Sequence, residues 1–86
     1  SEDPVAVPEN HEHLVSLLGT LIEHEALKDR KFDIDFSEAR VVGARLAELL
    51  PCPNRHKQRL LEMRDPVARL GEIEKLLERI QDVKEY

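Results

Sequence analysis

Cysteine, aromatic residues and long apolar runs are scarce in this sequence. Each scarcity limits the kinds of fold, core or setting that the protein can have. The single cysteine, Cys52, cannot form an internal disulfide, which excludes a disulfide-stapled fold and favours a reducing, cytoplasmic setting. With only three aromatic residues, the core must be aliphatic. No apolar run approaches the roughly 20 residues that span a bilayer, and no signal-peptide pattern is present, so a membrane is not an expected partner.

The charge balance narrows the expected partners further. Acidic residues number 18 against 13 lysines and arginines, which gives the 86 residues a net charge of −5. Phosphate backbones are bound by basic surfaces, so we do not expect a nucleic acid as the partner. Three glycines, 36% charged residues and 41% hydrophobic residues favour amphipathic helices over a sheet.

Apolar periodicity predicts an all-α fold, a compact bundle of four helices. Between residues 14 and 22, leucine and isoleucine recur at i, i+3, i+4, i+7 and i+8, which places them on one helix face. Similar stripes follow in three later segments. The predicted helices span residues 9–28, 36–50, 53–63 and 66–83. At the centres of their stripes, five leucines are expected to be buried: Leu18, Leu46, Leu61, Leu70 and Leu77.

Proline and acidic residues mark the predicted helix ends. Asp35, with Glu38 three residues later, resembles a capping box at the start of the second helix. The Pro-Cys-Pro segment at 51–53 ends that helix, because proline cannot continue the backbone hydrogen bonds, and it opens the third helix. Asp65 is a good N-cap and Pro66 a good first helical residue, so the fourth helix is expected to start there.

No catalytic residue, cofactor or metal site is predicted. A G-x-x-x-x-G-K-[ST] phosphate-binding loop is absent. His11 and His13 point in different directions on a helix and His24 lies far along its axis, so all three are expected to be solvated surface side chains. Cys52 and His56 are four residues apart at a helix start, where a thiol pKa can fall. The favoured interpretation of Cys52 is nevertheless a small, half-buried apolar residue.

A pattern of residues runs from the end of the second predicted helix into the fourth. It consists of a Leu-Pro elbow, Lys-Gln, a Leu-Leu-Glu run, Asp, Arg-Leu and paired leucines. Its residues are Leu50-Pro51, Lys57-Gln58, Leu60-Leu61-Glu62-Met63, Asp65, Arg69-Leu70 and Leu76-Leu77. The pattern resembles the helical half of the N-terminal substrate-recognition domain of Lon proteases. Cys52 departs from it, since the family usually has an apolar residue at that position.

The resemblance implies a non-catalytic module that binds protein or peptide. Such domains also contain a β-rich half, so residues 1–8 are expected to form an extended linker from that upstream half, and residues 9–86 the helical subdomain. The Ser–Lys dyad and nucleotide-binding domain of Lon proteases have no counterpart here. Pro66, and the absence of any sign of a long helix leading into an ATPase, look more like stand-alone bacterial Lon-domain proteins than a full protease. A structural or oligomerisation bundle and a fragment of a full ATP-dependent Lon protease are the alternatives.

Two groups of residues are candidates for contact with a partner. Lys57 and Gln58 belong to the resemblance, and the pattern leaves open whether they bind anything or brace the elbow. The second group contains apolar side chains outside the predicted stripes: Val15, Leu27, Ile34, Phe36, Val41 and Leu76. We expect this group to meet the upstream β-rich half, a second copy of the chain or an unfolded polypeptide. A basic cluster at 55–64 is expected to be an internally paired surface, with an acidic partner segment as the alternative.

Overall fold

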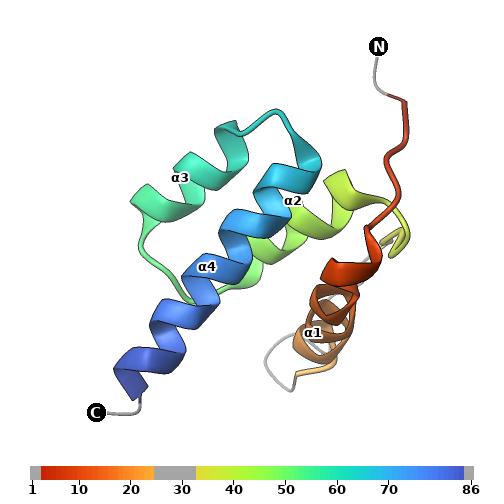
Figure 1. The fold of residues 1–86 in the computed structure, drawn as a ribbon. Helices are drawn as coiled ribbons and strands as arrows, with labels where there is room; N and C mark the ends of the chain where they lie inside the picture. Colours follow the sequence, from red (N-terminus) through yellow and green to blue (C-terminus); the bar gives the residue numbers. More distant parts are fainter. Residues whose placement is uncertain (1–2, 25–32, 85–86) are drawn as a thin grey trace.

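Four α-helices build the part of the chain that the computed structural model describes, residues 3–24 and 33–84 (Figure 1). They are α1 (Glu12–Ile22), α2 (Ala39–Leu49), α3 (Asn54–Glu62) and α4 (Pro66–Lys84), and a 3₁₀ turn, Glu9–His11, precedes α1. Among those residues, the one β-type pairing is an isolated antiparallel bridge between Ala6 and Glu38. The predicted all-α fold of four helices is therefore confirmed.

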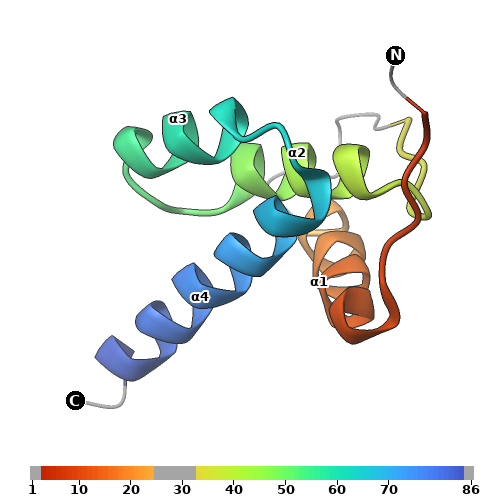
Figure 2. The ribbon, with the colours of Figure 1, turned by 45° about the horizontal axis from the view of Figure 1, so that its top comes forward.

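The α2 helix is the element around which the others are arranged. It packs against α1, α3 and α4, and both views place α1 and α3 on opposite sides of the α2–α4 pair (Figure 1, Figure 2). The buried hydrophobic side chains are all aliphatic, as the shortage of aromatic residues requires, and each buried leucine contributes about 1.5–3 kcal/mol. They are Leu14, Leu18, Ala39, Val42, Leu46, Ala47, Leu50, Leu60, Leu70, Ile73 and Leu76.

Three of the five leucines expected at the centre of the core are fully buried, namely Leu18, Leu46 and Leu70. The prediction is wrong for Leu61, whose exposed fraction is 50%. In α3 the one buried residue is Leu60, which precedes Leu61. The Leu61 side chain projects about 100° further around the helix axis. A short helix that packs through one side therefore leaves its second leucine on the surface.

The expected roles of Leu76 and Leu77 are reversed in α4. Leu76 is buried, whereas Leu77 is half-buried and lines a shallow hollow beside His13. Leu76 instead lies next to Pro51 and the rest of the α2–α3 connection. Because α4 packs against the elbow on one side and lies beside α1 on another, the position of both neighbours decides which leucine is buried. The apolar stripe of α4 alone does not specify this.

The α1 helix is shorter than predicted. It follows the 3₁₀ turn and ends at Ile22, and Glu23 and His24 form a turn instead of continuing the helix toward residue 28. The His24 N–H donates to the Leu21 carbonyl at 3.1 Å, a tighter i→i−3 bond of the kind that ends helices. The predicted remainder of this helix, which includes Leu27, lies outside the described residues.

The α2 helix starts at Ala39 rather than at Phe36, and the expected capping box is absent. Asp35 Oδ1 accepts the Ser37 hydroxyl at 2.6 Å and the Ser37 backbone N–H at 3.0 Å, so it closes a local turn instead of capping α2. These hydrogen bonds, that of the hydroxyl first, hold the pKa of the Asp35 carboxyl below its ordinary value. Glu38 precedes the helix in an extended conformation without a side-chain cap.

The segment before α1 explains this late start, because it is fastened to the beginning of α2. The Ala39 N–H donates to the Val5 carbonyl at 2.8 Å, and the Val7 N–H donates to the Ser37 carbonyl at 3.1 Å. Glu38 Oε2 accepts the Val5 N–H at 2.8 Å, so the carboxylate expected to cap α2 binds a segment far away in the sequence. Ala6 of this segment forms a bridge with Glu38, and Val5 and Val7 also pack against the core.

Candidate functional site

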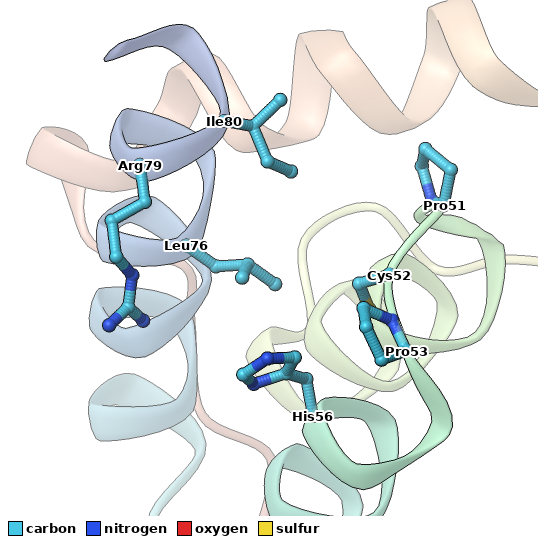
Figure 3. A pocket seen from close by; sticks show the side chains of 7 residues that line it. All are labelled: Pro51, Cys52, Pro53, His56, Leu76, Arg79 and Ile80. Carbon is cyan, nitrogen blue, oxygen red and sulfur yellow. The ribbon is translucent and has the colours of Figure 1, made fainter. Parts of the chain in front are cut away.

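An apolar hollow between the α2–α3 connection and α4 is the best-defined candidate site, and we call it the elbow groove. Its volume is about 460 Å³. Figure 3 shows Leu76 and Ile80 pointing from α4 toward the elbow, with Arg79 on the same helix. The lining residues are Pro51, Cys52, Pro53, His56, Leu76, Arg79 and Ile80. Two prolines, a leucine and an isoleucine give the groove an apolar surface with polar groups at its edge.

The two prolines shape the elbow side of the groove. Pro51 and Pro53 lack the backbone N–H that a continuing helix needs, and α2 ends before them. Between them, the Cys52 N–H donates to the Leu50 carbonyl at 2.9 Å, which makes the connection a tight turn. The Pro53 carbonyl then accepts the His56 N–H at 3.0 Å as α3 begins. This turn brings Cys52 and His56 into one groove, and Cys52 is half-buried as predicted.

Lys57 and Gln58, the pair that the resemblance contributed, have different surroundings. Lys57 Nζ donates to the Glu48 carbonyl at 2.6 Å. This bond satisfies one of the carbonyls that α2 leaves without an intrahelical partner, at the helix end where the dipole favours a positive charge. Lys57 therefore braces the elbow, which is one of its two predicted roles. Gln58 is exposed and does not line the groove.

Arg69 fixes α3 against α4 from the opposite side. Its Nε donates to the Leu60 carbonyl at 2.9 Å and its Nη2 to the Met63 carbonyl at 2.7 Å, while Nη1 reaches the Arg40 carbonyl at 3.5 Å. Burial, and then the neighbouring Arg40, lowers the pKa of the Arg69 guanidinium below its ordinary value, and the group stays protonated at neutral pH. Gly43 provides the space, since a Cβ there would lie 3.0 Å from Arg69 Cδ.

Asp65 starts α4 as predicted. Its Oδ1 accepts the Val67 N–H at 3.0 Å and the Ala68 N–H at 3.1 Å, and Pro66 is the first residue of the helix. Together with the lysine and the arginine just described, this aspartate belongs to the Lon-like pattern. Three polar positions of that pattern thus bond to backbone atoms near the ends of helices, which is a structural role.

Arg79 is the one arginine or lysine that lines the elbow groove, and two further arginines lie close enough to act on its His56. Burial lowers the pKa of the His56 imidazole, and the charges of Arg55, Arg59 and Arg79 lower it further, so the ring is neutral at pH 7. Arg59 has a nearby acidic partner, because its Nη2 lies 3.8 Å from a carboxylate oxygen of Glu72. None of the ion pairs found among residues 3–24 and 33–80 involves Arg79. The groove therefore combines an apolar surface with a cationic edge.

The predicted contact residues do not form one surface. Val15 and Phe36 are half-buried and pack against the core. Val41 is half-buried as well, and it lines a separate hollow of α2 together with the exposed Leu61. Leu76 alone lines the elbow groove, where it is a nearly buried part of the surface and not the exposed side chain that was expected.

His11 also differs from expectation, whereas His13 is exposed as predicted. His11 is buried, and its Nδ1 lies 2.5 Å from Glu74 Oε1, although this contact lacks the alignment of a hydrogen bond. His13 Nε2 lies 2.6 Å from Glu74 Oε2, and its ring is largely exposed. The prediction failed for His11 because this residue ends a 3₁₀ turn, which lets both rings reach α4. No set of three histidine, cysteine, aspartate or glutamate side chains in the described part of the chain has an arrangement that would hold a metal ion.

Sequence reasoning missed most of the groove. The sequence predicts the two prolines only as residues that end one helix and open the next, and it predicts no site role for Arg79 or Ile80. A usable signal was present, since Arg79 and Ile80 follow Leu76 by three and four residues and therefore share its helix face. The spacing alone does not show that this face of α4 lies against the elbow.

Comparisons with family models, with curated proteins and with solved structures find no match for this chain. Among the described residues, no helix combines the length and apolar character that crossing a membrane requires. The Lon-like pattern therefore stays a resemblance. What the structure adds to it is a physical account of Lys57, Asp65 and Arg69 and a groove beside the segment that carries the pattern.

Proposed function

We propose that this chain is a non-catalytic protein-binding module that holds an extended polypeptide segment in the elbow groove. The observation that supports this proposal best is the groove itself, an apolar hollow of about 460 Å³ with polar groups at its edge. Sites of this size and composition are those in which proteins bury ligand side chains, with the polar groups fixing orientation. The setting that we propose is the cytoplasm, where a single half-buried thiol stays reduced.

The bracing of the groove supports the same proposal. Its elbow side is restrained by two prolines and by the Lys57 bond to the Glu48 carbonyl, while Arg69 holds α3 on α4. A site that is already ordered loses little conformational entropy on binding, so even a small contact area gives useful affinity. The resemblance to the Lon substrate-recognition domain points to the same class of partner. We expect no peptidase or ATPase turnover by this chain.

A structural or oligomerisation role is the second candidate, and one observation favours it. Leu61 is the one large hydrophobic side chain that is exposed in the described part of the chain, and it lies beside Val41 on the face formed by α2 and α3. Exposed apolar groups that cluster often mark a surface covered by another protein surface. In this alternative the upstream β-rich half or a second copy covers that face, and the elbow groove stays empty.

Two matched substitutions separate these candidates. Ile80→Ser removes an apolar side chain from the groove, and Leu61→Ser removes one from the α2–α3 face. Titration with a reduced, alkylated unfolded protein, followed by backbone NMR, should shift residues 51–56 and 76–80. Ile80→Ser should weaken binding about fivefold to tenfold, because about 1 kcal/mol of apolar burial is lost, and Leu61→Ser should leave it unchanged.

The opposite pattern would support the second candidate. If Leu61→Ser alone weakens binding, or if only this variant abolishes self-association in sedimentation, the partner surface is the α2–α3 face. Absence of any chemical-shift change in the groove on addition of the unfolded protein would contradict the proposed function. Hydrolysis of a labelled unfolded protein that a single substitution abolishes would contradict its non-catalytic character.

A further inference from the structure

A cationic side chain, Arg79, lines the elbow groove of a chain whose net charge is negative. The net charge is −5, yet three arginines at positions 55, 59 and 79 act on the imidazole of His56. This imidazole is neutral at pH 7 because its pKa is lowered first by burial and then by the arginines. The positive potential is therefore a local property of the groove, and a general attraction of the molecule for anions does not explain it.

Of the arginines near the groove, Arg79 is the cation best placed to meet a ligand. It lines the groove directly, one residue before Ile80 and one turn of α4 after Leu76. The Arg59 guanidinium already lies 3.8 Å from a carboxylate oxygen of Glu72. Arg79, in contrast, takes part in none of the ion pairs among the described side chains. A guanidinium at the rim of an apolar site binds a carboxylate through paired hydrogen bonds and packs its aliphatic stem against apolar atoms.

We propose that the elbow groove selects acidic-apolar polypeptide segments, in which aliphatic side chains fill the groove and an adjacent Asp or Glu carboxylate pairs with Arg79. This inference rests on the proposed function and specifies its ligand. The aliphatic side chains of the segment would contact Leu76, Ile80 and the two elbow prolines. Its carboxylate would pair with Arg79, the single arginine or lysine that lines the groove. Charge complementarity of this kind sets specificity and orientation more than total affinity.

Three peptides test the selection directly. They share a Leu-Ile-Leu sequence and differ only in whether Glu, Gln or Lys follows it, and a fluorophore at the far end reports binding by anisotropy. The chain should bind the Glu peptide about fivefold more tightly than the Gln peptide, and the Lys peptide should bind most weakly. The preference should shrink as ionic strength rises, because the pair lies at an exposed edge.

Charge-changing variants test whether Arg79 is the cation that causes the preference for the Glu peptide. Arg79→Gln should make the Glu and Gln peptides equal, and Arg79→Glu should reverse the order in favour of the Lys peptide. Arg64→Glu is the matched control, since it makes the same charge change at an exposed arginine that lines a different hollow. This control should preserve the order of the three peptides, and circular dichroism should show that all variants keep their helices.

The outcomes distinguish this inference from the proposed function. If the three peptides bind equally and Ile80→Ser still weakens them, the groove binds polypeptide without charge selection and only the inference is wrong. A preference for Glu that survives Arg79→Gln also contradicts the inference. If no peptide binds at millimolar concentration, both the inference and the proposed function are rejected.

Discussion

The α2–α3–α4 part of the molecule and the α1 part are held by different kinds of interaction. In the first part, Lys57, Asp65 and Arg69 each form hydrogen bonds with backbone atoms near a helix end. The N-terminus of α1 has no side-chain hydrogen bond of this kind. The α1 helix itself is held by leucines buried against α2. His11 of the 3₁₀ turn and His13 of α1 share the carboxylate of Glu74 on α4, and the segment before them is hydrogen-bonded to the start of α2.

This difference indicates which part of the molecule is fixed in shape. Hydrogen bonds have a defined direction, and those of Lys57 and Arg69 join their helices to carbonyls of a neighbouring element, whereas the burial of apolar surface has no direction of its own. The elbow groove lies entirely in the part that carries these bonds, and none of its lining residues comes from α1. We therefore expect α1 to contribute to stability and to affect the groove very little.

The largest effect should come from the core that both parts share. Leu70 is fully buried, so Leu70→Ala should reduce the free energy of unfolding by about 2–5 kcal/mol, through lost burial and an unfilled cavity. Urea denaturation followed by circular dichroism measures this loss. Leu61→Ala is the control, because its side chain is half-exposed and the change should stay within about 0.5 kcal/mol. Equal losses in the two variants would mean that the assignment of buried faces is wrong.

A smaller effect should reveal the link between Arg69 and Gly43. Arg69→Ala leaves the carbonyls of Leu60 and Met63 without this donor and should cost about 2 kcal/mol. Gly43→Ala adds about 1 kcal/mol of helix propensity, which contact with the Arg69 side chain at 3.0 Å should cancel in the unmodified chain. In the Arg69→Ala background the full gain should appear.

The test is a double-mutant cycle measured by denaturation, with an expected coupling of about 1 kcal/mol between the two positions. Gly71→Ala is a suitable control, since a Cβ there would meet nothing within 4 Å and its gain should not depend on Arg69. If Gly43→Ala has the same effect in both backgrounds, the close approach does not limit this position.

The smallest effect should distinguish the α1 part from the rest. Glu74→Gln removes the charge that His11 and His13 share and should cost about 0.5–1 kcal/mol. Amide hydrogen exchange should become faster in α1 and stay unchanged at the start of α4, and peptide binding in the groove should persist. Glu78→Gln, an exposed change on the same helix, should leave exchange in α1 as it was. Faster exchange throughout α3 would contradict the independence of the two parts.

Features that depend on neighbours in the sequence could be predicted, and features that depend on distant segments could not. The Asp65-Pro66 start of α4 involves residues within three positions of each other, and it was predicted correctly. The start of α2 was predicted wrongly, because Val5 occupies the Glu38 carboxylate from far away in the sequence. Pattern reasoning has no access to that contact.

The same distinction explains the errors in the core and in the site. The apolar period of α4 was recognised, yet the choice between Leu76 and Leu77 depends on how α4 lies between the elbow and α1. His11 was expected on the surface because a regular helix was assumed where the structure has a 3₁₀ turn. The groove likewise joins Pro51 to Ile80, which no local spacing relates.

The position of Cys52 has a practical consequence for experiments on the groove. It is the one cysteine of the chain, and it lies half-buried among the groove residues. A thiol-reactive fluorophore or spin label therefore attaches at a single, known place without any prior mutagenesis. Such a label would report directly when a peptide enters beside it. A peptide whose own thiol is already in a disulfide with a small leaving thiol would be captured there by thiol–disulfide exchange, because the Cys52 thiolate displaces that leaving thiol and forms a mixed disulfide for structural work.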